Sequence, residues 1–178
     1  MQNLYGRKAI DYIYKNKPSL ASLSENCRNT QQIGDLLRRL GGARMATSSP
    51  DGQGIFWIEA NDTDELIAAL ETELEDLVVQ RSIDPSHILI VSASKKDQLL
   101  IVETDPGHFE CTSWEDRGDA NIVCETIHRS KGLEFDVVIL IAMSEEVSDS
   151  LLYVGSSRAV SLLTVISPQS VAARLGIA

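Results

Sequence analysis

Apolar and polar positions along the chain follow two periods in turn. Short apolar runs typical of strands alternate with longer segments in which apolar residues recur at helical spacing. The expected strands are 54–60, 87–92, 122–126, 136–142 and 162–167, and the expected helices are 29–40, 62–78, 148–160 and one that begins at 167–168. This alternation predicts an α/β fold in a single domain, with an open, mostly parallel sheet flanked by helices.

Local signals place some of the element ends. Asn29 with Gln32 predicts a capping box at the start of the first helix. Ser167 and Pro168 predict the N-cap and the first position of the last helix. The run at 136–142 is apolar throughout, which suits a central parallel strand covered on both faces.

Acidic residues gather on one predicted helix. Seven carboxylates fall within residues 62–76, and four leucines between 66 and 77 recur at helical spacing. This pattern predicts an amphipathic surface helix with a solvated acidic face, which we favour over an acidic binding site. Residues 95–119 are harder to interpret, because 99–102 fit a helix or a strand equally well.

The formal net charge of -10 is distributed unevenly. Residues 1–50 carry a net charge of +5, residues 51–120 carry -13 and residues 121–178 carry -2. Such an acidic balance argues against a free-standing, non-specific nucleic-acid binder, which would need a basic surface.

The cysteines and apolar runs bear on the cellular compartment. Cys27, Cys111 and Cys124 lack C-x-x-C spacing, which disfavours a zinc cluster or disulfide scaffold and favours a reducing compartment. The longest apolar run, 137–143, is much shorter than the roughly 20 residues of a membrane span, and no signal-peptide pattern opens the chain. We therefore expect a cytoplasmic protein without a metal cluster or membrane contact.

Three polar segments have residues suited to chemistry. Residues 126–136 form a loop with a glycine after a predicted strand, at the carboxyl end where open α/β folds bind ligands. Arg158 lies late in a helix of small residues, and Arg28 lies just before a helix start. Each feature alone is weak, because an arginine near a helix end more often caps carbonyls or pairs with a carboxylate.

Together, and in this order, the segments resemble the motifs of superfamily 1 helicases of the UvrD/Rep type. Residues 126–140 resemble motif V, T-x-H-x-x-K-G-L-E-F/W-x-x-V, and residues 153–159 resemble motif VI, Y-V-A/G-x-T/S-R-A. Residues 26–30 resemble motif IV, N-Y-R-S/T, with Cys27 in place of the usual Tyr. Residues 1–5 resemble the tail of motif III, and residues 41–120 match in broad layout only.

The resemblance implies a second RecA-like motor domain, with a P-loop NTPase-like fold that lacks its own P-loop. ATP with Mg²⁺ would then bind in the cleft between this domain and an N-terminal RecA-like domain of the same chain. By similarity, Arg28 and Arg158 are the arginine fingers, whose planar, permanently charged groups suit phosphate oxygens. Glu134 would bind the ribose hydroxyls beside the Gly132 backbone, and Gln2 would sense the γ-phosphate.

The same resemblance implies contact with single-stranded DNA. Thr126 and His128 of motif V would face the strand and couple its position to the ATP cleft. The implied activity is that of an ATP-dependent DNA helicase that translocates along single strands, with a role in DNA repair. Few aromatic residues are available for base stacking, so DNA binding by this chain alone is expected to be weak.

Two parts of such a motor are missing from the sequence. No G-x-x-x-x-G-K-[ST] pattern occurs, and no strand ending in Asp-Glu precedes motif IV to hold the metal. We therefore expect the chain to be the C-terminal piece of a longer ATPase and to be inactive alone. Residues 31–125 also leave little room for the large accessory insertion of many relatives.

Two other functions compete with this one. A stand-alone, catalytically inactive helicase-like module that binds proteins or DNA remains open, and an upstream Walker A lysine would argue against it. A dinucleotide-binding enzyme domain is poorly supported, because no G-x-G-x-x-G follows a strand.

Overall fold

The computed structural model describes residues 25–26, 28–42, 44–45 and 49–178. Its main sheet has six strands in the order β3-β8-β7-β4-β6-β5, and every neighbouring pair is parallel. The strands are β3 (Gly54–Glu59), β4 (Ile88–Ser92), β5 (Cys111–Thr112), β6 (Ile122–Thr126), β7 (Phe135–Ile141) and β8 (Ala159–Ser167). The predicted α/β fold with an open, mostly parallel sheet is therefore confirmed. Gln2 and Cys27 lie outside the described residues.

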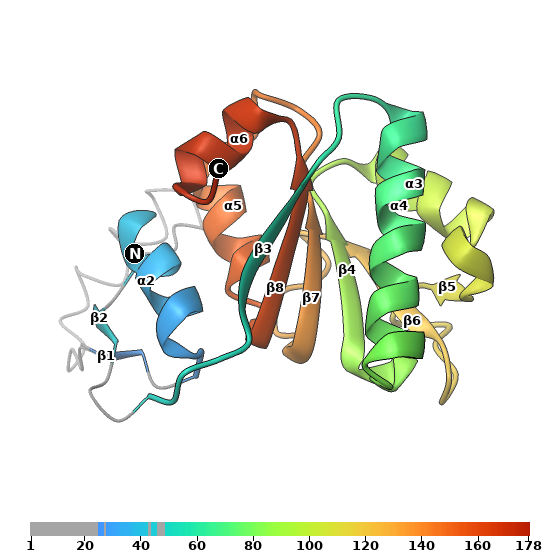
Figure 1. Cartoon of the computed structure of the whole chain (residues 1–178), viewed down its shortest axis with the longest axis horizontal. Helices are drawn as coiled ribbons and strands as arrows, with labels where there is room; N and C mark the ends of the chain where they lie inside the picture. Colours follow the sequence, from blue (N-terminus) through green and yellow to red (C-terminus); the bar gives the residue numbers. More distant parts are fainter. Residues whose placement is uncertain (1–24, 27, 43, 46–48) are drawn as a thin grey trace, which may run out of the picture.

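Helices cover both faces of this sheet (Figure 1). One face carries α2 (Gln31–Arg39), α5 (Asp149–Ser156) and α6 (Gln169–Leu175). The other carries α3 (Thr63–Leu74), a π-helical turn (Glu75–Gln80) and α4 (Lys95–Thr104). Short 3₁₀ turns occupy Pro85–His87 and Pro106–His108, and a small parallel pair joins β1 (Glu25–Asn26) to β2 (Arg44–Met45). No helix within the described ranges is long and apolar enough to cross a membrane.

Alternation along the strands builds two hydrophobic cores, one on each face. In β7, Val138 and Leu140 join the core under α2, α5 and α6, whereas Val137 and Ile139 join the core under α3 and α4. All four are buried, because β7 lies between β8 and β4 with helices on both sides. The prediction of a central strand covered on both faces is confirmed.

Two predicted helix caps are wrong. The N-cap of α2 is Thr30, and the side chain of Asn29 instead donates from Nδ2 to the carbonyl of Ala159, far along the chain. Ser167 is the last residue of β8, and Pro168 takes the N-cap position of α6. In both cases pairing with a distant strand decides the conformation, which a local capping pattern does not register.

The end of α5 also differs from the prediction. The helix ends at Ser156, so Arg158 lies in the turn before β8 and not inside a helix. Strand β8 begins at Ala159 because that residue pairs with Phe135 at the start of β7. Residues 99–102, which fitted either element, are helical in α4.

The acidic helix begins as predicted, with Asp62 accepting a hydrogen bond from the Glu65 backbone N–H at 2.9 Å. One carboxylate of this helix faces inward. Glu73 is half-buried and accepts a hydrogen bond from Thr164 Oγ1 of β8 at 2.5 Å. Burial raises the pKa of Glu73, although the Thr164 bond and Arg81 act in the opposite direction. A raised folded-state pKa gives stability that is present at low pH and lost as the pH rises through that value.

Glu73→Gln is therefore expected to raise the free energy of unfolding at pH 7 by less than about 1 kcal/mol, since partial exposure weakens the effect. Glutamine keeps the acceptor oxygen for Thr164 without the buried charge. The gain should shrink as the pH falls toward the ordinary Glu pKa of 4.5. Urea denaturation at pH 7 and near pH 4.5 measures this gain in unfolding free energy, and Glu71→Gln, at an exposed position of the same helix, is the control. An equal gain at the two pH values would contradict the assignment.

Candidate functional site

Three residues from motifs IV, V and VI meet at the amino edge of the sheet. Glu134 directly precedes β7 and Arg158 directly precedes β8, and these two strands are parallel neighbours. Arg28 Nε lies 2.9 Å from Glu134 Oε1, with both side chains about half exposed. The two arginines and one carboxylate leave an excess positive charge, which suits an anionic ligand.

Arg158 is held deeply in this cluster, with only 5% of its surface exposed. Its guanidinium donates to the carbonyl of Val154 at 3.0 Å, to the carbonyl of Leu133 at 3.3 Å and to Ser157 Oγ at 2.9 Å. Burial first, and the neighbouring Arg28 second, lower the pKa of Arg158. The side chain therefore ties the motif V loop to the end of the motif VI helix.

Motif IV is attached to motif VI through its neighbouring residues. Asn29 donates to the carbonyl of Ala159, and the Thr30 backbone N–H donates to the carbonyl of Val160 at 3.1 Å. These bonds fix the backbone beside Arg28 against the first residues of β8. From the sequence, Asn29 is predicted only as a helix cap; in the motif IV pattern it stands after Arg28, at the Ser/Thr position.

Motif V connects the two edges of the sheet. Thr126 ends β6 at the carboxyl edge, whereas Glu134 lies at the amino end of β7. Because β6 and β7 run in the same direction, the chain from 127 to 134 must traverse the length of the sheet. The expectation that this whole loop lies at the carboxyl edge is therefore wrong for its second half, including Gly132 and Glu134.

The first part of the loop forms a tight hydrogen-bonded turn. The backbone N–H groups of Arg129 and Ser130 both donate to the carbonyl of Thr126, at 3.0 and 2.9 Å. Ser130 is fully buried and its hydroxyl donates to the carbonyl of Ile127 at 2.9 Å. Gly132 is exposed with φ +89°, a left-handed conformation that favours glycine.

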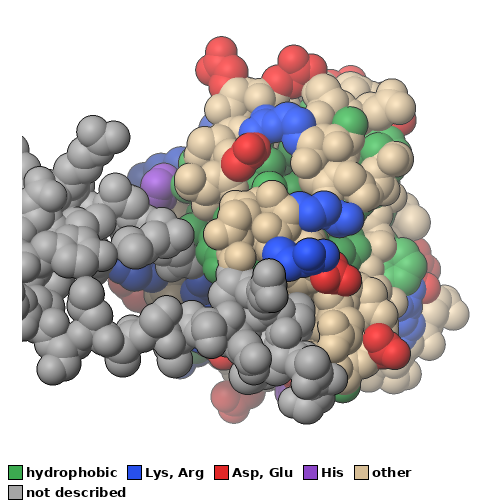
Figure 2. Space-filling model, turned by 90° about the vertical axis from the view of Figure 1, so that its left-hand side faces the viewer, with side chains coloured by type: hydrophobic (Ala, Val, Ile, Leu, Met, Phe, Trp, Pro, Cys, Tyr) green, Lys and Arg blue, Asp and Glu red, His purple; other side chains and the backbone are tan. Residues whose placement is uncertain are grey.

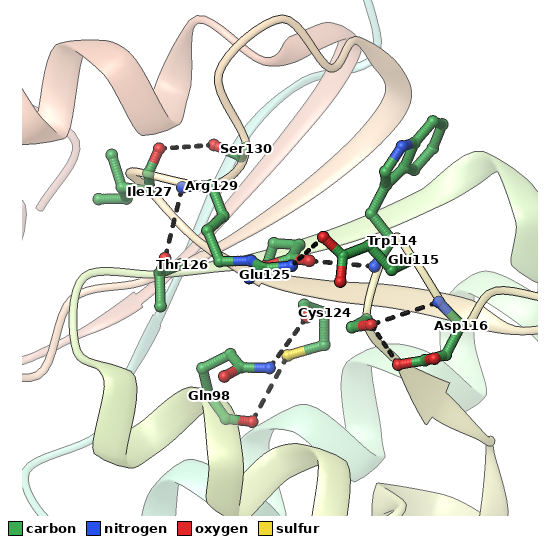
Figure 3. Close-up of polar contacts among 11 residues, drawn as sticks. Gln98, Trp114, Glu115, Asp116, Cys124, Glu125, Thr126, Ile127, Arg129 and Ser130 are labelled. Carbon is green, nitrogen blue, oxygen red and sulfur yellow. Dashed lines mark hydrogen bonds and ion pairs between the residues drawn. The ribbon is translucent and has the colours of Figure 1, made fainter.

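A buried carboxylate next to motif V was not predicted from the sequence. Glu125 of β6 is 1% exposed and accepts hydrogen bonds from Arg129 Nε at 2.9 Å and from the Trp114 backbone N–H at 3.0 Å. Arg129 also pairs with Glu115 at 3.2 Å (Figure 3). Glu125 thus joins β6, the motif V turn and the turn around residue 114. An acidic residue within the apolar run 122–126 was the available signal.

The predicted DNA-contacting residues lie at the opposite edge from the arginines. Thr126 is half-buried, and its hydroxyl accepts from the Arg129 backbone N–H at 3.4 Å. His128 is exposed, and the neighbouring Ile127 N–H donates to the carbonyl of Ser92 at the end of β4. The structure therefore places Thr126 and His128 together, but separates them from Arg28 and Arg158 by the length of the strands.

Two arginines of α2 and α6 are already engaged within the domain. Figure 2 shows Lys and Arg side chains, with acidic ones beside them, on the face that carries α2. Arg38 of α2 pairs with Asp35 at 3.3 Å, and Arg174 of α6 pairs with Asp149 and donates to the carbonyl of Val147. We therefore do not assign this face to an anionic ligand.

Metal and thiol chemistry receive no support from the described part of the chain. No group of three or more His, Cys, Asp or Glu side chains in those ranges is placed to hold a metal ion. Cys111 and Cys124 are buried free thiols, and burial raises the pKa of Cys111 to about 12 and that of Cys124 well above its ordinary value. Neither thiol is suited to act as a nucleophile.

Comparison with protein families gives a match over motifs V and VI. Residues 121–166 match the profile of the UvrD-like helicase C-terminal domain. This match agrees with the resemblance that the motifs show, and the matched residues include both Glu134 and Arg158. No curated protein sequence matches the chain.

Solved structures resemble this chain in fold. The C-terminal domain of a possible DNA helicase from Lactobacillus plantarum WCFS1 superposes with a TM-score of 0.66 at 21% identity, covering 83% of this chain and 91% of that one. PRRSV nsp10, a helicase, gives a TM-score of 0.44 at 16% identity, covering 87% of this chain and 26% of that one. Arterivirus nonstructural protein 10, also a helicase, gives 0.45 at 15% identity, with 87% and 28% covered. The chain spans about a quarter of these viral proteins.

Proposed function

We propose that this domain is the second motor domain of an ATP-dependent DNA helicase of UvrD type that translocates along single-stranded DNA. Its arginines would act on ATP bound against an N-terminal RecA-like domain of the same protein. The observation that carries the proposal is the meeting of Arg28, Glu134 and Arg158 at one edge of the sheet. The family match over 121–166 supplies the helicase context.

The exposed pair of Arg28 and Glu134 suits exchange for a nucleotide. An ion pair between half-exposed side chains contributes little stability, so a triphosphate can replace the carboxylate as partner of Arg28 at small cost. Glu134 is then available to accept hydrogen bonds from the ribose hydroxyls, close to the exposed Gly132 backbone. Arg158 is held in place by three hydrogen bonds and would add a second positive charge at the γ-phosphate.

Mg²⁺ does not fit the described residues of this domain as a directly bound ion, because no suitable cluster of acidic ligands occurs among them. We therefore assign Mg²⁺ no ligand here and derive no step through it.

The motif V loop would link DNA to ATP. Thr126 and the exposed His128 at the carboxyl edge can donate hydrogen bonds to a DNA phosphate, while Glu134 at the other end of the same loop would hold the ribose. A displacement of the DNA end of the loop would be transmitted through the buried Ser130 and the Glu125–Arg129 pair.

A second candidate function is a catalytically inactive helicase-like module that binds proteins or DNA. The burial of Arg158 favours it, because the guanidinium already bonds to groups of its own domain. These bonds would give Arg158 a structural role without any contact with ATP.

ATP hydrolysis with and without single-stranded DNA separates the two functions. The full-length protein that carries this domain is expected to hydrolyse ATP several-fold faster when single-stranded DNA is added. Residues 1–178 alone should hydrolyse none, because no phosphate-binding loop occurs in their sequence. A colourimetric phosphate-release assay measures both. Absence of DNA-stimulated turnover in the full-length protein would overturn the helicase proposal and favour the inactive module.

A further inference from the structure

Glu125 is a buried acidic side chain that lies directly before the motif V pattern. Its carboxylate joins two separate segments of the chain (Figure 3). Oε1 accepts a hydrogen bond from the Trp114 backbone N–H at 3.0 Å, and Oε2 accepts one from Arg129 Nε at 2.9 Å. A buried carboxylate is strongly destabilising unless it is paired and hydrogen-bonded. The charge of Glu125 therefore holds both donors in place.

The two partners of Glu125 are both donors, so the position requires a side chain that only accepts. A carboxylate accepts on each oxygen, whereas the amide of glutamine carries a donor at one end. In Glu125→Gln the amide oxygen can accept from Trp114 or from Arg129, but not from both. Arg129 is the partner that is released, because its side chain is about half exposed and can turn to water.

The Trp114 side of this link is held independently of Glu125. The guanidinium carbon of Arg117 lies 3.4 Å from the centre of the Trp114 ring, and Arg117 also donates to the Trp114 carbonyl at 2.6 Å. Phe135, the first residue of β7, meets the Trp114 ring edge-on, with centroids 6.2 Å apart. The turn after β5 is therefore a fixed point against which Glu125 can hold the motif V turn.

Arg129 closes the motif V turn with both its backbone and its side chain. Its backbone N–H donates to the Thr126 carbonyl at 3.0 Å and to Thr126 Oγ1 at 3.4 Å, while its side chain reaches back to Glu125. The Thr126 hydroxyl accepts within the turn, so its own proton can be donated outward. His128 directly precedes Arg129 and is exposed. The conformation of Arg129 thus decides how Thr126 and His128 are presented.

We infer that Glu125 is a positioning residue for the binding of single-stranded DNA. Through Arg129 it holds the turn in the conformation that presents Thr126 and His128 to a DNA phosphate. The inference rests on the proposed function, which assigns the DNA contacts to those two residues. Glu125 precedes the motif pattern and Arg129 occupies one of its variable positions, so the resemblance gives neither a role. Glu125 acts without touching DNA, because only 1% of its surface is exposed.

The test measures the Kd of the full-length protein for fluorescein-labelled oligodeoxythymidine by fluorescence anisotropy at one fixed salt concentration. Glu125→Gln is expected to raise this Kd about five- to tenfold, the cost of one misplaced hydrogen bond to a phosphate. Glu115→Gln removes the exposed partner of Arg129 and is the matched control, expected to change Kd less than about twofold. A variant that only folded less well would bind fewer equivalents of DNA with an unchanged Kd.

The ATPase assay separates this inference from the proposed function. In Glu125→Gln the KM for ATP should stay within about twofold, because uniform binding of ATP at the other edge of the sheet is not altered. An unchanged Kd for DNA in Glu125→Gln, with DNA-stimulated hydrolysis in the wild type, would overturn the inference and leave the proposed function standing. A wild type that neither binds DNA nor responds to it would overturn both.

Two substitutions of Arg129 distinguish positioning from direct contact with DNA. Arg129→Gln places an amide N–H where Nε stands and keeps the bond to Glu125, so Kd should stay within about threefold. Arg129→Met has no donor and should raise Kd about five- to tenfold, as Glu125→Gln does. Equal losses in the two Arg129 variants would mean that Arg129 itself contacts DNA, and would overturn the positioning role of Glu125.

A double-mutant cycle with His128→Ala tests the route from Glu125 to DNA. His128→Ala alone is expected to raise Kd about fivefold. In the Glu125→Gln protein the same substitution should raise Kd less than about twofold, because His128 is already displaced from the phosphate. Additive effects would overturn the inference. So would an unchanged Kd in His128→Ala alone, since the contact that Glu125 positions would then not exist.

Discussion

Arg158→Ala in the full-length protein is expected to lower the DNA-stimulated kcat for ATP by about 10³-fold or more, the usual contribution of an arginine finger. The Kd for ATP should change only a few-fold, because the finger acts mainly where charge develops in the transition state. Phosphate release measures the first quantity, and competition with a fluorescent nucleotide measures the second. Normal turnover in this variant would contradict the assignment of Arg158.

The structural bonds of Arg158 require a matched set of variants. The alanine variant also removes hydrogen bonds to Val154 and Leu133, so its thermal stability should fall. Arg28→Ala removes a half-exposed side chain and should lower kcat with no comparable loss of stability. Arg174→Ala, on the far helix α6, should leave kcat unchanged. If Arg28→Ala retained full turnover, the effect of Arg158→Ala would be explained by folding alone.

Leu140→Ala is expected to produce the largest loss of stability, about 3 kcal/mol in the free energy of unfolding. Leu140 is fully buried in the central strand β7 and packs in the core under α5. A domain of this size should then melt roughly 10 °C lower. Leu99→Ala, on the exposed face of α4, is the control and should cost less than about 0.5 kcal/mol.

Gly155 of the motif VI helix α5 packs against Leu140, so the two positions can be tested together. A Cβ at Gly155 would stand 2.7 Å from Leu140 Cδ1 and 3.3 Å from Ile127 Cδ1, so the helix lies directly on the strand and on motif V. Gly155→Ala should therefore destabilise the wild type, where the methyl group clashes with Leu140, and stabilise the Leu140→Ala protein, whose cavity accepts the methyl group. Urea denaturation of the four proteins measures this coupling. Additive effects would show that Gly155 and Leu140 do not share the space.

The strands of this fold could be predicted from sequence because their apolar runs are short, continuous and separated by turn residues. Helix ends could not, because they depend on distant partners. Asn29 has the sequence of a cap, but the carbonyl of Ala159 takes its amide, and β8 takes the residues that would have prolonged α5. Such competition is settled by tertiary pairing, which has no local signal.

The candidate site divides in the same way. Arg28, Glu134 and Arg158 could be predicted from the order of the motifs along the sequence, and the structure brings these three residues together. The sequence did not show that they gather at the amino edge, because strand direction and neighbour order decide this. Trp114 lies outside the motif patterns, and Glu125 lies within a predicted strand just before motif V. Their structural role is visible only from their contacts with other residues.

The order of strands also governs how the chain can fold. The first strand of the main sheet, β3, pairs within the described residues only with the last, β8, through Gly54↔Leu162 to Glu59↔Ser167. More than a hundred intervening residues must be made before that contact forms, so the edge strand waits for nearly the whole domain to be synthesised. Closing so long a loop carries an entropic cost before any pairing offsets it. During synthesis the aromatic strand with Phe56 and Trp57 is therefore exposed for most of the time the ribosome spends on this domain.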